Sequence, residues 1–258
     1  MRTGAAQIAW LVMLGACCGA VSTHGAPAIP VELVRLSQAY PGQIKGATTA
    51  DIVLASSVHV SYTNGREAEP FEQRLGHASL KDQMAIPYPA GASYPVPSGD
   101  NDPGRLRNIP FFQAMYGADE RAVRSHLVTV RWLGRRDLLV TSVNGVDKAL
   151  MRVSNALMQL PRQILDCASG AGTFAYRRVA GSDYLSPHSF GIAIDLNRGC
   201  SNYWYWDKRR RRDGSFAYVN RMPIEIVLAF EREGFIWGGK WAHYDTMHFE
   251  YRPELLVR

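Results

Sequence analysis

The sequence lacks the patterns of several common protein classes. No glycine-rich loop of the Walker or Rossmann type occurs, which excludes those phosphate-binding motifs. No segment recurs with a period of roughly 20–50 residues, so a repeat array is excluded. Beyond the first residues, no stretch reaches the roughly 18 consecutive apolar residues of a transmembrane helix. What remains is a chain of 258 residues, 47% hydrophobic and 20% charged, which is typical of one or two globular domains.

Residues 1–26 have the features of a bacterial secretory signal peptide. A positive charge at the start precedes an apolar stretch over residues 8–16, and small residues follow. We therefore predict export to the periplasm or cell envelope. Two processing routes fit this sequence: lipidation of Cys17, which would attach the protein to a membrane, or ordinary cleavage a few residues later. A buried N-terminal helix is the alternative to a signal peptide.

Charge is unbalanced in favour of basic residues. The formal net charge is +6, which favours anionic partners. Residues 208–212 are five consecutive cations, which we interpret as a solvated loop or a site of attraction to anionic cell-wall polymer. Nucleic acid is not predicted as a partner, because the N-terminus is typical of an exported protein. The oligomeric state is left open.

Cysteine is scarce in the chain that would remain after export. Of four cysteines, only Cys167 and Cys200 lie outside the region of the signal. An oxidising compartment favours a bridge between them, and this bridge would stabilise the fold by roughly 3–4 kcal/mol on a loop-entropy model. Two separate buried thiols are the alternative.

Local patterns predict several elements. Alternating apolar residues predict hairpins, and apolar residues at steps of three or four predict amphipathic helices. The hairpins are predicted at residues 58–71 and 127–143, and the helices at residues 146–160 and 223–233. Residues 86–110 are rich in proline and glycine and are predicted to be loop-like. We expect residues 27–160 to form a β-rich subdomain or to wrap the rest of the chain.

Residues 186–197 contain a candidate strand with an unusual acid. Ile194 and its apolar neighbours make a core strand, yet Asp195 lies within it, and a buried carboxylate is costly without a positive partner. A metal ion would supply that charge. His188 lies seven residues upstream, and Gly191 allows the chain to turn so that the imidazole approaches the carboxylate.

Residues 247–251 form a second candidate strand, in which His248 and Glu250 share one face. If the two strands pair, His188, Asp195 and His248 come together. Two histidines and a carboxylate with an open fourth position are typical of a hydrolytic zinc site. Asp245 could then serve as general base. The alternative is that His188 is a loop histidine whose hydrogen bonds are made within the protein and that Asp195 is ion-paired.

The two motifs together resemble a known family. Ser-x-His-x-x-Gly-x-Ala-x-Asp, followed by Asp-x-x-His-Phe-Glu, is similar to the zinc peptidases of the D-alanyl-D-alanine carboxypeptidase and L-alanyl-D-glutamate peptidase family, relatives of the hedgehog fold. The resemblance assigns residues 161–258 to the catalytic domain. It implies an α+β fold in which a small antiparallel sheet, flanked by helices, carries one zinc ion per chain.

The resemblance also implies roles for individual residues. His188, Asp195 and His248 correspond to the zinc ligands, and Asp245 corresponds to the catalytic acid and base. Arg177 matches the arginine that stabilises either the oxyanion developing on the scissile carbonyl or the substrate carboxylate, although Arg178 follows it directly.

Further residues near the two motifs are candidates for the site. Ser186 takes the place of a substrate-contacting serine. His243 could orient Asp245 or contact substrate, Trp241 could wall the cleft, and Glu250 could fix the tautomer of His248.

The predicted activity is zinc-dependent hydrolysis of an amide bond in a peptidoglycan stem peptide. The family resemblance leaves two bonds open, the D-alanyl-D-alanine bond and the L-alanyl-D-glutamate bond. A different class of function is a non-catalytic cell-wall-binding module that keeps zinc for stability. Asp245 and Arg177 favour catalysis, because a structural zinc site needs no base.

Overall fold

The structure of the protein is a computed structural model that describes residues 28–207 and 217–257. The predicted signal with Cys17 and the basic run at 208–212 lie outside the described residues. Within the described part of the chain, no helix has the length and apolar character needed to cross a membrane.

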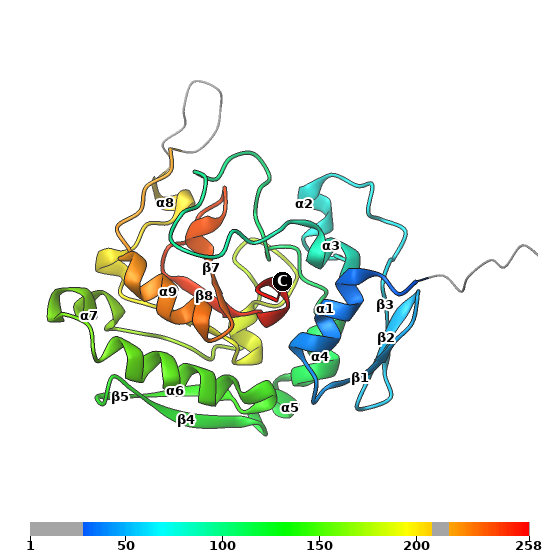
Figure 1. The fold of residues 1–258 in the computed structure, drawn as a ribbon, viewed down its shortest axis with the longest axis horizontal. Coiled ribbons are helices and arrows are strands. Elements are labelled where there is room, and N and C mark those ends of the chain that lie inside the picture. The colour runs from blue at the N-terminus through cyan, green and yellow to red at the C-terminus, as the bar shows by residue number, and fades with distance from the viewer. Residues whose placement is uncertain (1–27, 208–216, 258) are drawn as a thin grey trace, which may run out of the picture.

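Short helices alternate with three small antiparallel sheets (Figure 1). The α-helices are α1 (Val31–Ala39), α2 (Phe71–Arg74), α3 (Leu80–Ala85), α4 (Ile109–Tyr116), α5 (Glu120–Arg124), α6 (Val146–Leu157), α7 (Arg162–Ala168), α8 (Trp204–Asp207) and α9 (Ile224–Arg232). The strands are β1 (Ile44–Ala47), β2 (Asp51–Leu54), β3 (His59–Ser61), β4 (Leu127–Trp132), β5 (Arg136–Thr141), β6 (Ala193–Asp195), β7 (Phe235–Trp237) and β8 (His248–Tyr251). The 3₁₀ helices are η1 (Val143–Gly145), η2 (Pro187–Phe190), η3 (Arg198–Cys200), η4 (Gly238–Lys240) and η5 (Pro253–Leu255).

One predicted hairpin is confirmed and the other is wrong. Strands β4 and β5 pair antiparallel, with Val130 opposite Leu138. At residues 58–71, however, β3 pairs with the preceding strand β2. The predicted return strand is a turn followed by α2, because Asn64 accepts a hydrogen bond from the Arg66 backbone and Pro70 starts the helix. The local turn chemistry therefore does not return the chain to β3.

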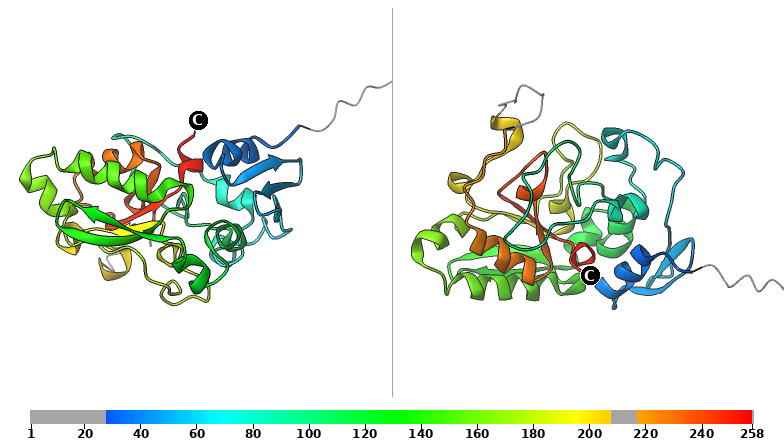
Figure 2. Two further views of the ribbon diagram at one scale, coloured as in Figure 1. Left: turned by 90° about the horizontal axis from the view of Figure 1, so that it is seen from below. Right: turned by 45° about the horizontal axis from the view of Figure 1, so that its top comes forward.

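Both predicted long helices are confirmed, and they cover the sheets. Helix α6 packs along β4 and also contacts α9, which in turn packs on β7. Figure 1 shows α6 lying along the β4–β5 hairpin, with α9 between α6 and the third sheet, and Figure 2 shows the same layers from two other sides.

The third sheet, in the order β6-β8-β7, is the framework of the site. At the centre of β8, Phe249 stacks on Phe230 of α9 at 4.1 Å between ring centroids. Since side chains alternate along a strand, His248 and Glu250 lie on the opposite face of β8 from Phe249. The α+β fold with a small antiparallel sheet beneath the candidate ligands agrees with the prediction.

One hydrophobic core crosses the boundary predicted at residue 160. It contains Leu33 and Leu36 of α1 as well as Phe230 and Phe249. Residues 86–108, here called the strap, run over the third sheet. There the Tyr88 hydroxyl accepts a hydrogen bond from the Trp237 backbone at 3.0 Å. The N-terminal region is thus wound around the sheet that carries the candidate ligands.

A covalent link ties the end of α7 to η3. Cys167 and Cys200 form a disulfide with their Cα atoms 5.5 Å apart. This link braces the chain on both sides of β6, the strand that ends at Asp195.

Candidate functional site

His188 is placed by a short capped turn. It lies in η2, whose first turn is capped by Ser186, and the turn ends at Gly191 with φ 68°. A side chain at Gly191 would meet the Thr141 backbone nitrogen at 2.9 Å. The Nδ1 of His188 donates to the Thr173 carbonyl at 2.6 Å, since a carbonyl only accepts. This bond leaves Nε2 as the nitrogen that faces Asp195, 3.2 Å from its Oδ1.

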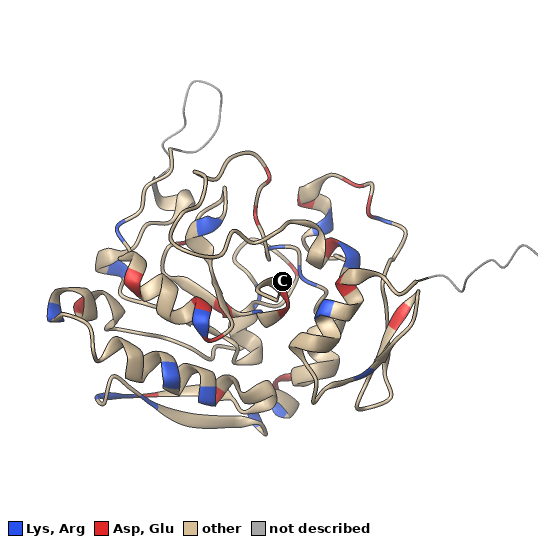
Figure 3. Cartoon of the chain, in the orientation of Figure 1, with Lys and Arg blue, Asp and Glu red and all other residues tan. Residues whose placement is uncertain are grey.

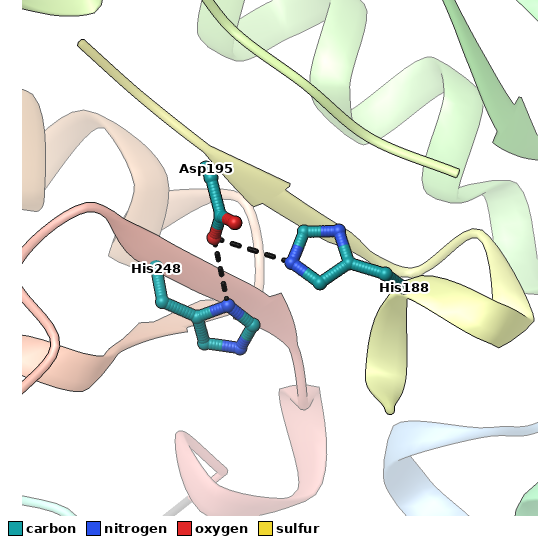
Figure 4. Close-up of side chains that lie close together, drawn as sticks. All are labelled: His188, Asp195 and His248. Atoms are coloured by element: carbon teal, nitrogen blue, oxygen red, sulfur yellow. Dashed lines mark hydrogen bonds and ion pairs between the residues drawn. The ribbon is translucent and has the colours of Figure 1, made fainter. Parts of the chain in front are cut away.

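Strand pairing brings the other two candidate ligands together. Asp195 of β6 lies directly opposite His248 of β8 in the antiparallel register. The Nδ1 of His248 lies 3.0 Å from Asp195 Oδ1 (Figure 4). Figure 4 shows both imidazoles pointing at the same carboxylate. The ligand atoms of His188, Asp195 and His248 all lie within 4.8 Å of one another.

The chemistry of this group fits a metal ion such as zinc. Bond lengths of about 2.0–2.2 Å around a tetrahedral ion place neighbouring ligand atoms about 3.3 Å apart, close to the observed 3.0 and 3.2 Å. The Nε2 of His188 is buried, and it faces the Asp195 carboxylate. Three ligands leave one position for water or substrate, as in catalytic zinc sites.

Electrostatics at the group also favour a cation. Burial lowers the pKa of His248, but hydrogen bonds to Asp195 and Glu250 outweigh burial and raise that pKa to about 9. Burial raises the pKa of Asp195, yet the two histidines hold it well below its usual range. When no metal is bound, His248 therefore keeps a proton at neutral pH beside the ionised Asp195. A bound metal ion would replace that proton.

Behind His248 lies a buried ionic network, of which only Glu250 was predicted from the sequence. Glu250 Oε2 lies 3.3 Å from His248 Nε2, as expected of a group that fixes the tautomer. Arg107 of the strap donates to the same carboxylate from Nη2 at 2.6 Å, and Arg252 donates at 2.8 Å. Arg252 also bonds Glu254 at 2.6 Å. No local pattern marks Arg107, because its partner lies 143 residues away.

Asp245 lies beside the ligand group in an environment suited to proton transfer. Its Oδ1 is buried and has no hydrogen-bond partner among the described residues. Burial is the main cause that raises its pKa, to about 6. The charge on Asp195 also raises that pKa, while the charge on His248 lowers it. A carboxyl group with a pKa near the working pH can both accept and return a proton.

A cleft of about 350 Å³ opens over these groups. Its lining includes the three candidate ligands and Asp245. It also includes aromatic side chains from the segment around α8 and from the strap-facing side of the third sheet: Tyr203, Trp204, Trp206 and Trp241.

The remaining predicted residues divide between the cleft and its supports. Arg177 is exposed and lines both the cleft and a neighbouring pocket, whereas Arg178 lines only the neighbouring pocket. Ser186 lines the cleft but also caps η2 by accepting a hydrogen bond from the His188 backbone. Trp241 lines the cleft, lies 5.6 Å from the His248 ring and donates to the Pro103 carbonyl.

His243 also lines the cleft, and its Nδ1 is bonded to a strap residue that the sequence did not suggest. That residue is Asp102, at 2.7 Å. Arg105 of the strap is another cleft residue that sequence analysis missed.

The charged side chains of the described chain are mixed in sign rather than gathered in one basic face. In the view of Figure 3, both basic and acidic residues occur along α6, α9 and α1. The cleft itself combines Arg105, Arg107 and Arg177 with Asp195 and Asp245.

One known family has a model that matches the segment carrying the candidate site. Residues 180–251 match the family model described as D-alanyl-D-alanine carboxypeptidase. Comparisons with curated proteins and with solved structures gave no match. The matched segment contains all three candidate ligands and Asp245, and it supports the resemblance to D-alanyl-D-alanine carboxypeptidases that the two motifs predicted.

Proposed function

We propose that the protein is a zinc-dependent peptidase that removes the terminal D-alanine from peptidoglycan stem peptides. The observation that carries the proposal is the convergence of His188, Asp195 and His248 beside Asp245 in one cleft. The family match supports the class of reaction and the D-alanyl-D-alanine bond. Location in the periplasm or cell envelope is part of the proposal and rests on the sequence of residues 1–26.

Each group has a defined task in the proposed reaction. A zinc ion held by His188, Asp195 and His248 would supply Lewis-acid polarisation of the scissile carbonyl and would acidify water. Asp245 removes a proton from the attacking water and returns it to the leaving amine, for which its raised pKa is suited. Arg177 stabilises the negative charge that develops on the carbonyl oxygen.

A non-catalytic zinc module that binds the cell wall is less well supported. A structural zinc site is normally closed by four protein ligands. Here the described residues bring three candidate ligands together. A buried, poorly solvated carboxyl group such as Asp245 is costly to maintain without a catalytic use. These two features favour hydrolysis over a purely structural role for the metal.

Digestion of purified muropeptides tests the proposal. Zinc-loaded protein should release one D-alanine from pentapeptide stems, detected by mass spectrometry. Asp245→Asn should bind zinc as the wild type does but lose at least roughly 100-fold in rate, since a general base contributes about that much or more. A product cut between L-alanine and D-glutamate would reassign the bond. Zinc binding without cleavage of any stem peptide would favour the wall-binding module.

A further inference from the structure

The strap places a buried acid between two residues of the cleft. Asp102 is fully buried, and its Oδ1 accepts a hydrogen bond from the His243 backbone at 2.9 Å. Its Oδ2 accepts one from His243 Nδ1 at 2.7 Å and one from Arg105 Nη1 at 2.6 Å. Two hydrogen bonds therefore hold Asp102 to His243, and a third holds Arg105 to Asp102.

Arg105 differs from the other two arginines of the cleft. Arg107 is committed to Glu250 through both Nε and Nη2. Arg177 is exposed, and its Nη1 bonds the carbonyl of the next residue. Arg105 is only 17% exposed and is held by one terminal nitrogen to a buried carboxylate. A guanidinium carries five N–H donors, so the bond from Nη1 to Asp102 orients Arg105 and uses only one of them. Arg105 also lines the cleft.

We propose that Arg105, positioned by Asp102 and His243, binds a carboxylate of the substrate and so selects peptides with a free C-terminus. This inference rests on the proposed function, because it names the group that the same cleft recognises. A guanidinium pairs with a carboxylate through two parallel hydrogen bonds. It rejects a carboxamide of equal size, whose NH₂ group would face N–H donors. Arg105 is thus a substrate-binding residue, and Asp102 and His243 are positioning residues.

The test uses binding rather than turnover, so that it stands apart from the peptidase assay. The probe is the pentapeptide L-Ala-γ-D-Glu-L-Lys-D-Ala-D-Ala, prepared with a free C-terminal carboxylate and as the C-terminal amide. Both forms share every other charge. Calorimetry measures the dissociation constants with full-length, zinc-loaded Asp245→Asn protein, in which hydrolysis should be slowed at least roughly 100-fold. We expect the acid to bind roughly 10- to 100-fold more tightly than the amide, as for a charge-assisted hydrogen-bonded pair.

Arg105→Gln, combined with Asp245→Asn, should bring the ratio of the two dissociation constants close to one. The dissociation constant of the amide should stay within about threefold of its value in the Asp245→Asn protein. Arg105→Lys guards against a folding defect, because lysine keeps the ion pair with Asp102. Its single nitrogen cannot also form a two-point contact with a carboxylate, so the preference for the acid should still fall. Arg66→Gln removes another Arg–acid pair at i,i+3, which lies outside the cleft, and should change nothing.

The positioning role has its own test. His243→Ala should weaken the preference for the acid, whereas His243→Asn should restore most of it, because the asparagine NH₂ occupies the place of Nδ1. A preference that persists in Arg105→Gln would overturn the inference, as would equal binding of acid and amide before that change. Equal weakening of both peptides would assign Arg105 a merely structural role. Absence of cleavage by the wild type, by contrast, would count against the proposed function alone.

Discussion

Glu250 is the residue through which the N-terminal region reaches the candidate metal site. Its carboxylate is completely buried and is shared by His248, Arg107 and Arg252. The two arginines hold the pKa of Glu250 well below its usual range, although burial by itself raises it. A permanently ionised partner fixes which nitrogen of His248 faces Asp195. We therefore expect Glu250 to control metal affinity without being a ligand.

Replacement of Glu250 by glutamine should separate that effect from stability. Glu254 offers a matched control, since it is equally buried and also bonds Arg252, but its other partners are Tyr40 and Gln83. Glu250→Gln should lower the free energy of unfolding by about 3 kcal/mol or more, because it leaves the buried Arg107 without an acid. Glu254→Gln should also lower the free energy of unfolding, because it removes one of the two acids that pair with the buried Arg252. Only Glu250→Gln should also weaken zinc binding, by roughly 10- to 100-fold. Zinc affinity is measured by competition with a chelating dye. Equal zinc affinities of Glu250→Gln and Glu254→Gln would contradict this role of Glu250.

Asp102 should make the metal-free fold sensitive to acid. Burial raises its pKa, but His243 and Arg105 outweigh burial and hold it below its usual value. A depressed pKa in the folded state stabilises the fold above the pKa of the unfolded chain, about 3.9. That stabilisation is lost as the pH falls below about 4 through the folded-state pKa. Urea unfolding of the chelated protein should therefore show a shallower loss of stability with acid in Asp102→Asn than in the wild type.

The control for this measurement is Asp137→Asn, which removes an acid from an exposed pair with Arg131. Exposed pairs contribute little, so this variant should follow the wild type. An identical pH dependence in Asp102→Asn and Asp137→Asn would show that Asp102 is not stabilised as described.

At the scale of elements, periodicity was informative wherever one face of an element is buried. The alternation in residues 192–196 and 247–251 predicted strands, and β6 and β8 do pair with Asp195 opposite His248. The helix spacing predicted α6 and α9 to within a few residues. The hairpin predicted at residues 58–71 failed, because β3 finds its partner in β2. The sequence of a short strand does not determine which neighbouring strand it pairs with.

The disulfide between α7 and η3 should stabilise the fold without forming part of the site. It closes a loop with a sequence separation of 33 residues, which contains η2 and β6. Reduction, or the double change to serine, should lower the free energy of unfolding by roughly 3–4 kcal/mol. Zinc affinity measured well below the melting temperature should remain within a few-fold of the wild type. A large loss of zinc affinity in the folded, reduced protein would contradict this division.

At the scale of the whole molecule, the site is assembled from two distant parts of the chain. The candidate ligands and Asp245 could be singled out from the sequence because their motifs lie within short segments. The supporting residues could not, because Arg107 and Asp102 meet their partners 143 and 141 residues further along. Single residues in a loop rich in proline and glycine carry no periodic signal of such contacts. The strap is thus a part of the site that only the three-dimensional structure reveals.

It follows that residues 161–258 should not form a stable domain alone. Without the strap, Glu250 loses Arg107, and the apolar residues that pack on α1 and α4 become exposed. The separate segment should show no cooperative thermal transition and should bind zinc far more weakly than the full chain. A cooperative transition with wild-type zinc affinity would instead establish the matched family segment as an independent unit.

The proposed mechanism requires one zinc ion per chain, held by His188, Asp195 and His248. Zinc should be titrated into chelator-treated protein while bound zinc and D-alanine release are measured in the same samples. We predict that activity rises in proportion to bound zinc and saturates at one equivalent per chain, and that His248→Ala prevents both. Full activity in the chelated protein, or one tightly bound zinc with no release of D-alanine, would contradict the account.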